Sequence, residues 1–97
     1  MIMKVRWSRL AVEDIRAIRA YIGEHDTAVA QKTVRNIISA VNKLIPENLS
    51  IGRAGRVSGT REMIIARTPF TVPYRVHGQS IHVLRVYHTS RRWPEKF

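Results

Sequence analysis

Cysteine is absent from this 97-residue sequence, and acidic residues are few. Without cysteine the chain has no disulfide bond, no thiolate zinc site and no cysteine nucleophile. Only seven Asp and Glu residues accompany 17 Lys and Arg residues, which gives a formal net charge of +10 with histidine neutral. So large a basic excess predicts an anionic partner, either a nucleic acid or an acidic protein surface.

Long apolar runs are also missing. No stretch approaches the roughly 18 apolar residues of a membrane-spanning helix, and the N-terminal residues Met1-Ile2-Met3-Lys4 meet a charge too early for a signal peptide. We therefore expect no membrane partner and a cytoplasmic protein. The apolar content of 44% is ordinary for a globular chain, and the length fits a single domain over residues 1–97.

The sequence contains no recognisable metal or cofactor motif. None of the four histidines has the spacing of metal ligands with acids nearby. The glycines of residues 52–59 are not followed by Lys-Ser, Lys-Thr or a helix, so no phosphate-binding loop is predicted. The sequence therefore predicts neither a metal ion nor a cofactor.

The first part of the chain predicts a strand and then a helix. Residues 2–7 alternate apolar and polar side chains, as a half-buried strand does. Ser8 is suited to cap a helix that Gly23 ends. Asp14 lies early in this helix, where the helix dipole favours an acid.

A second helix is expected to start at Asp26 or Thr27 and to stop at Pro46. Its apolar side chains recur at helical spacing, so the two helices form an amphipathic hairpin. The predicted core of this hairpin contains Leu10, Ile15, Ile18, Val34 and Ile38.

Residues 46–60 have the composition of a loop, and three strand-like runs follow, at residues 62–67, 70–76 and 81–88. The segment His77-Gly78-Gln79-Ser80 predicts a hairpin turn. Pro73 lies inside the second run and removes one ladder donor, so we expect it at an edge, at a bulge or facing solvent.

The predicted fold class is therefore α+β, with the order β-α-α-β-β-β. The helical hairpin packs on one face of a mainly antiparallel four-stranded sheet, and the other face is partly polar and basic. The charge is uneven, because residues 1–48 hold 8 basic and 5 acidic side chains whereas residues 49–97 hold 9 and 2. The second half is thus expected to face the anionic partner.

In this order, the blocks Gly59-Thr60-Arg61-Glu62, Tyr74-Arg75-Val76 and Leu84-Arg85-Val86-Tyr87-His88 resemble the toxins of the RelE/ParE superfamily. The resemblance covers nearly the whole chain. It implies the toxic half of a type II toxin–antitoxin module, held inactive by a small, often acidic antitoxin that folds on binding. ParE-like members poison DNA gyrase, whereas RelE-like members cleave mRNA on the ribosome with basic side chains and a His or Tyr.

Two features of the resemblance favour the ParE-like branch. Thr71 stands where RelE-like nucleases place a catalytic arginine, and Leu84 to His88 is similar to the last strand of ParE-like members. The expected partners are therefore an antitoxin and DNA gyrase. Under the alternative, the partners are the ribosome and mRNA, and the protein is a metal-independent endoribonuclease.

Candidate site residues follow from these two interpretations. Under the endonuclease alternative, His88 supplies the acid or base and Arg61 stabilises the phosphorane charge. In the second half of the chain, several cations and aromatics are suited to bind nucleic acid or an anionic protein. They are Arg53, Arg56, Arg75, Arg85, Tyr87, Arg91, Arg92 and Trp93.

Overall fold

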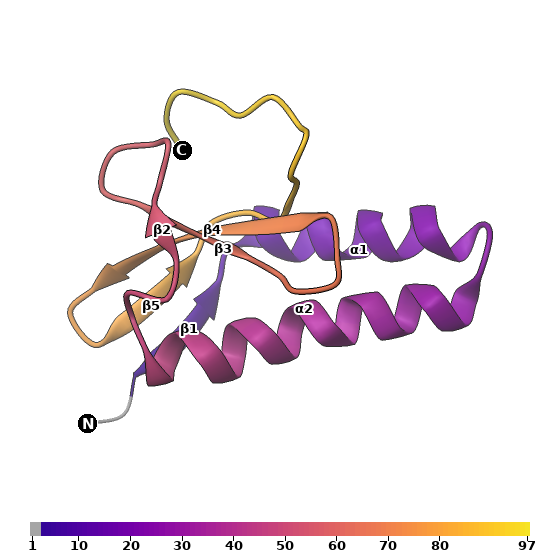
Figure 1. The fold of residues 1–97 in the computed structure, drawn as a ribbon, viewed down its shortest axis with the longest axis horizontal. Coiled ribbons are helices and arrows are strands. Elements are labelled where there is room, and N and C mark those ends of the chain that lie inside the picture. The colour runs from indigo at the N-terminus through magenta and orange to yellow at the C-terminus, as the bar shows by residue number, and fades with distance from the viewer. Residues whose placement is uncertain (1–2) are drawn as a thin grey trace.

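The computed structural model describes residues 3–97 (Figure 1). The elements in chain order are β1 (Lys4–Trp7), α1 (Arg9–Gly23), α2 (Thr27–Glu47), β2 (Arg53–Ala54), β3 (Arg61–Ile64), β4 (Phe70–His77), β5 (Ser80–Val83) and β6 (Tyr87–His88). The α+β class and the order of the main elements are confirmed. The sheet is mixed and has six strands instead of four, because the loop contributes β2 and the last predicted strand divides into β5 and β6. Ile2, in the predicted first strand, lies outside the described residues.

Both helices begin at the predicted caps. The Ser8 hydroxyl accepts a hydrogen bond from the Ala11 N–H at 3.0 Å, and the Asp26 carboxylate accepts one from the Val29 N–H at 3.1 Å. The predicted stop at Pro46 is wrong by one residue, since α2 continues to Glu47. Pro46 lies in the last turn, where its ring and missing N–H disturb little of the helix.

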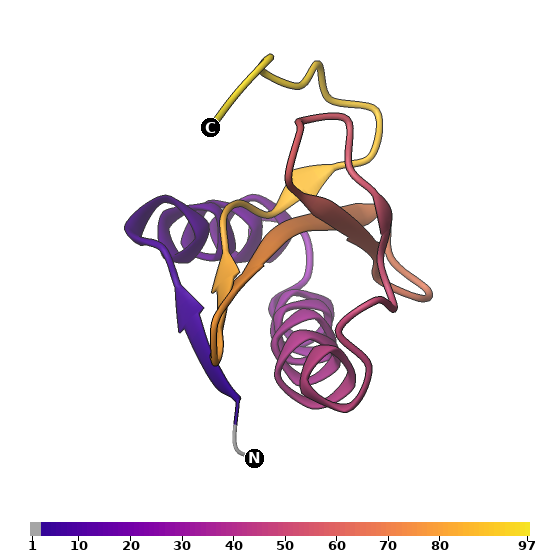
Figure 2. The ribbon, with the colours of Figure 1, turned by 90° about the vertical axis from the view of Figure 1, so that its left-hand side faces the viewer.

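The hairpin packs on one face of the sheet, mainly through α2 (Figure 2). Ile37, Val41 and Ile45 of α2 are completely buried against apolar side chains of β4 and β5. Of the predicted core residues, Val34 is buried and Ile15 and Ile18 are partly buried. Leu10 and Ile38 are instead 45% and 37% exposed. The buried stripe of α2 runs through Ile37, and Ile38 lies about 100° further around the helix.

The sheet has the order β1-β5-β4-β3-β2, with β6 beside β4. β1 runs parallel to β5, and every other pairing is antiparallel. The predicted turn joins β4 to β5, where His77 pairs with Ser80 and Gly78 adopts a φ of +58°. The side chains of alternate residues therefore divide between a helix-facing face and an outer face.

Pro73 coincides with a break in the last predicted strand. Tyr74 of β4 pairs with Val83 of β5, and Thr71 pairs with Tyr87 of β6. Three residues, 84–86, thus lie opposite two, 72–73, which is the arrangement of a β-bulge. The Pro73 carbonyl accepts a hydrogen bond from the Leu84 N–H at 2.9 Å, so its missing N–H faces the bulge. The expected placement of Pro73 is confirmed.

Asp14 of α1 holds this bulge. Its carboxylate accepts two hydrogen bonds from the Arg85 guanidinium, both at 2.8 Å, and a third from the Val86 N–H at 2.9 Å. The hydrogen bonds that Arg85 donates to Asp14 raise the pKa of Arg85 above its ordinary value, against the opposing effect of partial burial. Asp14 therefore supplies the acceptor for the Val86 N–H in the bulge and an anionic partner for Arg85.

Replacing Asp14 with Asn removes the ion pair while preserving the shape of the side chain. We expect the Asp14→Asn variant to lose about 2 kcal/mol of unfolding free energy in urea denaturation, because hydrogen bonds to charged groups are the stronger ones. Glu13→Gln is the matched control, because Glu13 is exposed and its substitution removes the same charge from the same helix. Equal losses in the two variants would contradict the role assigned to Asp14.

Candidate functional site

The last nine residues fold back over part of the outer face of the sheet (Figure 1). Tyr87, beside Thr71 on that face, is buried, and the Trp93 ring packs against it with centroids 5.0 Å apart at 69°. Phe97 stacks on the same tyrosine at 6.3 Å. These contacts fix the C-terminal segment to the half of the sheet formed by β3, β6 and the start of β4.

Arginines surround these aromatic rings. The Arg56 guanidinium lies 4.3 Å from the centre of the Trp93 ring. The guanidinium groups of Arg85 and Arg91 lie 4.8 and 4.7 Å from the centre of the Tyr87 ring. The structure thus brings together five of the predicted binding residues, which we call the tail cluster: Arg56, Arg85, Tyr87, Arg91 and Trp93.

A buried carboxylate already pairs with two of the predicted binding arginines. Glu62 on β3 is only 2% exposed and accepts a hydrogen bond from the Arg56 N–H at 2.6 Å. Its Oε1 also lies 3.4 Å from Arg53 and 3.5 Å from Arg56. Because Glu62 holds Arg53 and Arg56 and neutralises part of their charge, these two arginines have less charge available for an external anion. The only signal of this role in the sequence is that Glu62 is one of two acids after residue 48.

His88 and Arg61 lie apart. His88 pairs with Phe70, and its ring makes an edge contact with that residue at 5.7 Å. Arg61 pairs with Tyr74 and donates a hydrogen bond to the Gly52 carbonyl at 2.8 Å. Four residues of β4, or about 13 Å, separate the two positions. The buried side chain of Val72 lies between them on the same face of the sheet.

No cation replaces the missing arginine at Thr71. This residue is completely buried, and its hydroxyl lies 2.9 Å from the hydroxyl of Thr89. His88 Nδ1 is occupied by Ser90, whose hydroxyl lies 2.7 Å away. Arg75 and Arg92, the remaining predicted binding residues, are exposed on β4 and in the C-terminal segment and lie outside the tail cluster.

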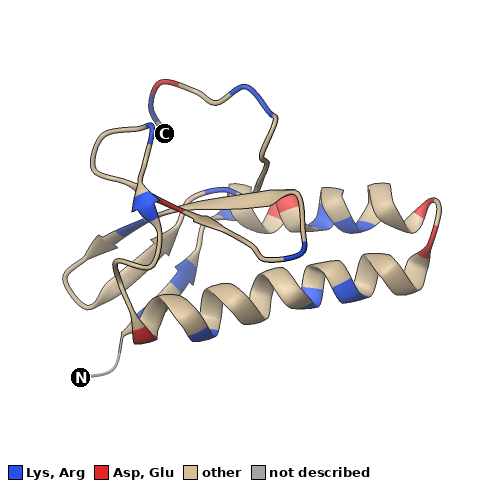
Figure 3. Cartoon of the chain, viewed as in Figure 1, with Lys and Arg blue, Asp and Glu red and all other residues tan. Residues whose placement is uncertain are grey.

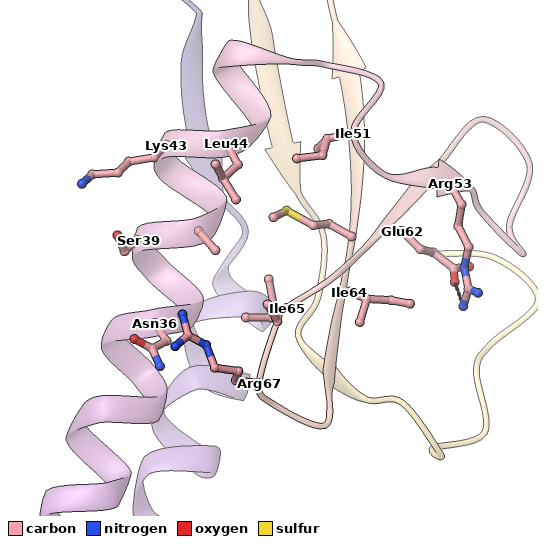
Figure 4. A pocket seen from close by; sticks show the side chains of 13 residues that line it. Asn36, Ser39, Lys43, Leu44, Ile51, Arg53, Glu62, Ile64, Ile65 and Arg67 are labelled. Carbon is pink, nitrogen blue, oxygen red and sulfur yellow. Dashed lines mark hydrogen bonds and ion pairs between the residues drawn. The ribbon is translucent and has the colours of Figure 1, made fainter.

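A groove of about 570 Å³ separates α2 from the edge of the sheet (Figure 4). Leu44, Ile51 and Ile64 line it and are 40%, 40% and 54% exposed. Lys43, Arg53 and Arg67 supply the cations of this α2–β3 groove. The groove is not recognisable in the sequence, because its three exposed apolar residues come from three separate segments.

One side of the α2–β3 groove is formed by the outer edge of β3, the edge that faces away from β4. β2 pairs only with Arg61 and Glu62, so past Glu62 the outer edge of β3 has no neighbouring strand within residues 3–97. The Ile65 N–H donates to Phe70 on β4 at 3.0 Å, so the N–H and C=O of Ile64 face the groove. Such an edge can accept an added strand from another chain.

A second groove, of about 540 Å³, lies where the helical hairpin extends past the sheet. Its apolar lining includes Ile18, Tyr21 and Phe70, and Arg67 borders both grooves. Arg67 adopts a φ of +64°, a conformation that costs free energy in a residue with a side chain. The turn between β3 and β4 thus presents this cation at the junction of the two grooves.

The described chain has neither a metal-binding cluster nor a membrane-spanning helix. Among residues 3–97, no three His, Asp or Glu side chains are grouped so that they could hold a metal ion. No helix in the same range is both long enough and apolar enough to cross a bilayer.

Comparisons with known proteins match this chain to toxins and toxin–antitoxin systems. Residues 5–93 match the family described as "ParE toxin of type II toxin-antitoxin system, parDE". The Y4kP protein of Sinorhizobium fredii, which carries a provisional toxin name, is 35% identical over 95% of this chain and 94% of its own length. The toxin RelE2 of Caulobacter vibrioides is 30% identical over 91% of this chain and 97% of its own.

A solved structure is also similar. It is described as the chromosomal ParDE toxin–antitoxin system from P. aeruginosa, and the matched chain superposes with a TM-score of 0.80 at 34% sequence identity. The match covers 90% of this chain and 96% of the other. The similarity to known toxins therefore extends to both the sequence and the fold.

The tail cluster predicts that Trp93 fixes the C-terminal segment. We expect Trp93→Ala to increase the rate of tryptic cleavage after Arg91 and Arg92 and to reduce stability by about 1–2 kcal/mol, since the ring contacts with Tyr87 and Arg56 are lost. Trp93→Phe is the control. It keeps a ring and loses no hydrogen bond, because the Trp93 Nε1 has no partner in the described structure. Unchanged proteolysis of Trp93→Ala would refute this role.

Proposed function

The chain belongs to the ParE toxin family of type II toxin–antitoxin systems, and we propose that it arrests growth by poisoning DNA gyrase until a small acidic antitoxin binds and inhibits it. DNA gyrase and the antitoxin are both macromolecules of the cytoplasm, so we propose that the toxin acts there.

The observation that carries the choice of target is the separation of His88 from Arg61. Metal-free RNA cleavage needs a proton-transfer group and cations around one phosphate. Here about 13 Å of β4 and the buried Val72 lie between the two candidates. Thr71 is occupied by Thr89 and brings no charge to either of them. This geometry favours a toxin that acts by binding over one that cleaves RNA.

The α2–β3 groove supports the second part of the proposal. It combines exposed Leu44, Ile51 and Ile64 with Lys43 and Arg67, so it suits a partner segment that is both apolar and acidic. The free edge at Ile64 offers backbone hydrogen bonds to an extended part of the same segment. A segment that folds on binding can follow such a groove over a large surface, at the cost of ordering itself.

Gyrase and ribosome assays distinguish the two targets directly. We expect the purified protein to inhibit DNA supercoiling by gyrase and to leave ribosome-bound mRNA intact. His88→Ala should retain gyrase inhibition and lose about 1 kcal/mol of stability, because the exposed side chain contributes one edge contact and the two hydrogen bonds between its Nδ1 and Ser90. Cleavage of ribosome-bound mRNA that falls by roughly 10²–10⁴ in a folded His88→Ala protein would show instead that the protein is a nuclease.

The antitoxin interface is tested by a matched pair of charge insertions. Ile64→Asp places a carboxylate in the groove opposite an acidic partner, so we expect it to weaken antitoxin binding by at least about tenfold in calorimetry. Val76→Asp is the control, because Val76 is also an exposed apolar strand residue (37%) but lies outside the groove. The antitoxin to be used is the one encoded beside this toxin. Equal affinities of the two variants would exclude the α2–β3 groove as its binding site.

A further inference from the structure

Part of the outer face of the sheet remains uncovered by the C-terminal segment. It is formed by β1, β5 and the end of β4, where Arg6 pairs with His82 and His82 pairs with Arg75. In the next row, Lys4 pairs with Ser80 and Ser80 with His77. We call these six residues, in two rows across three strands, the cationic sheet face.

The three strands of this face carry no acid. None of β1, β4 and β5 contains an Asp or Glu residue, and Figure 3 shows Lys and Arg on β1 and β4. Glu62 on the neighbouring strand β3 lies opposite Pro73 and pairs with Arg53 and Arg56. The ion pairs found within residues 3–97 use Arg53, Arg56 and Arg85. Lys4, Arg6 and Arg75 are all exposed. Because none of these ion pairs uses Lys4, Arg6 or Arg75, their charges remain available to an external anion.

The side chains of this face also lack apolar character. All six are charged, imidazole or hydroxyl groups, with no aliphatic, Phe, Tyr or Trp side chain among them. Protein interfaces need an apolar or aromatic centre, which this molecule provides in its two grooves. Contacts to a phosphodiester backbone need only cations and hydrogen-bond donors.

We propose that the cationic sheet face binds the sugar–phosphate backbone of duplex DNA without reading its sequence. Neighbouring strands lie about 4.8 Å apart, so the rows span about 10 Å. Duplex DNA carries roughly one negative charge per 1.7 Å of its axis, and several phosphates therefore face the rows at once. A single strand would instead require exposed aromatic rings on which its bases could stack.

This binding face is separate from the groove assigned to the antitoxin and from the tail cluster. The α2–β3 groove lies at the opposite edge of the sheet order, beside β3 and β2. The tail cluster covers the other half of the outer face. The inference therefore holds whichever enzyme is the target of the toxin, and its test does not require gyrase.

Fluorescence anisotropy of a labelled 20-base-pair duplex, measured over a series of salt concentrations, tests the proposal. We expect binding at low salt that weakens as salt rises. The Arg6→Gln/Arg75→Gln double variant should reduce the slope of log K against log salt concentration by about two, since each phosphate contact contributes about one unit. The variant should stay folded, because it removes only exposed charges that take part in none of the ion pairs within residues 3–97.

Arg16→Gln/Arg19→Gln is the matched control, since it removes the same charge from exposed positions on α1. We expect it to leave the slope unchanged. Equal effects of the two double variants would show that only net charge attracts DNA, which would overturn the proposal. Absence of duplex binding at low salt would also overturn the proposal, as would tighter binding of single-stranded RNA to the same face. A third contrary result would be that binding of a polyglutamate peptide depends on Arg6 and Arg75 whereas binding of the duplex does not.

Discussion

The Asp14 carboxylate makes three hydrogen bonds across the fold, and the position of everything after residue 83 depends on them. Pro73 has no N–H to donate to the neighbouring strand at the centre of the sheet. The hydrogen-bond ladder with that strand is interrupted opposite Pro73. The chain inserts one extra residue at 84–86, and Asp14 binds the Arg85 side chain and the Val86 N–H that this bulge exposes. As a result, β6 returns to β4 displaced from β5, and the C-terminal segment leaves it over the outer face.

This arrangement divides the arginines into two groups with different uses. Arg53, Arg56 and Arg85 are paired with Glu62 or Asp14, and they hold the loop, the bulge and the tail cluster in place. Arg6, Arg67 and Arg75 are exposed and make none of these ion pairs. The count of 17 Lys and Arg residues therefore overstates the number of cations that structure-forming pairs leave for partners, and the exposed cations lie on surfaces of different chemistry. Arg67 borders apolar grooves, whereas Arg6 and Arg75 lie on a wholly polar face.

Local signals in the sequence predicted the local structure well. Ser8, Asp26 and Gly78 have backbone roles that depend on a few neighbouring residues, and each lies where it was expected. Pro73 predicted that the ladder would be interrupted, but not which strand would respond. The role of Asp14 was not predictable, because its partner Arg85 is 71 residues away and only the folded topology brings them together. For the same reason the sequence does not reveal that Arg85 pairs with Asp14, nor the α2–β3 groove, which is built from three separate segments.

Asp14 replaces the strand acceptor that the Val86 N–H lacks in the bulge, and the C-terminal half of the structure depends on this bond. Amide hydrogen exchange of the unmodified protein tests this claim most directly, since protection reports whether an N–H is bonded in the native state. We predict that the Val86 amide exchanges only through global unfolding, as slowly as the amides of the central strands. Exchange of Val86 as fast as that of an exposed loop amide would show that Asp14 does not hold the bulge.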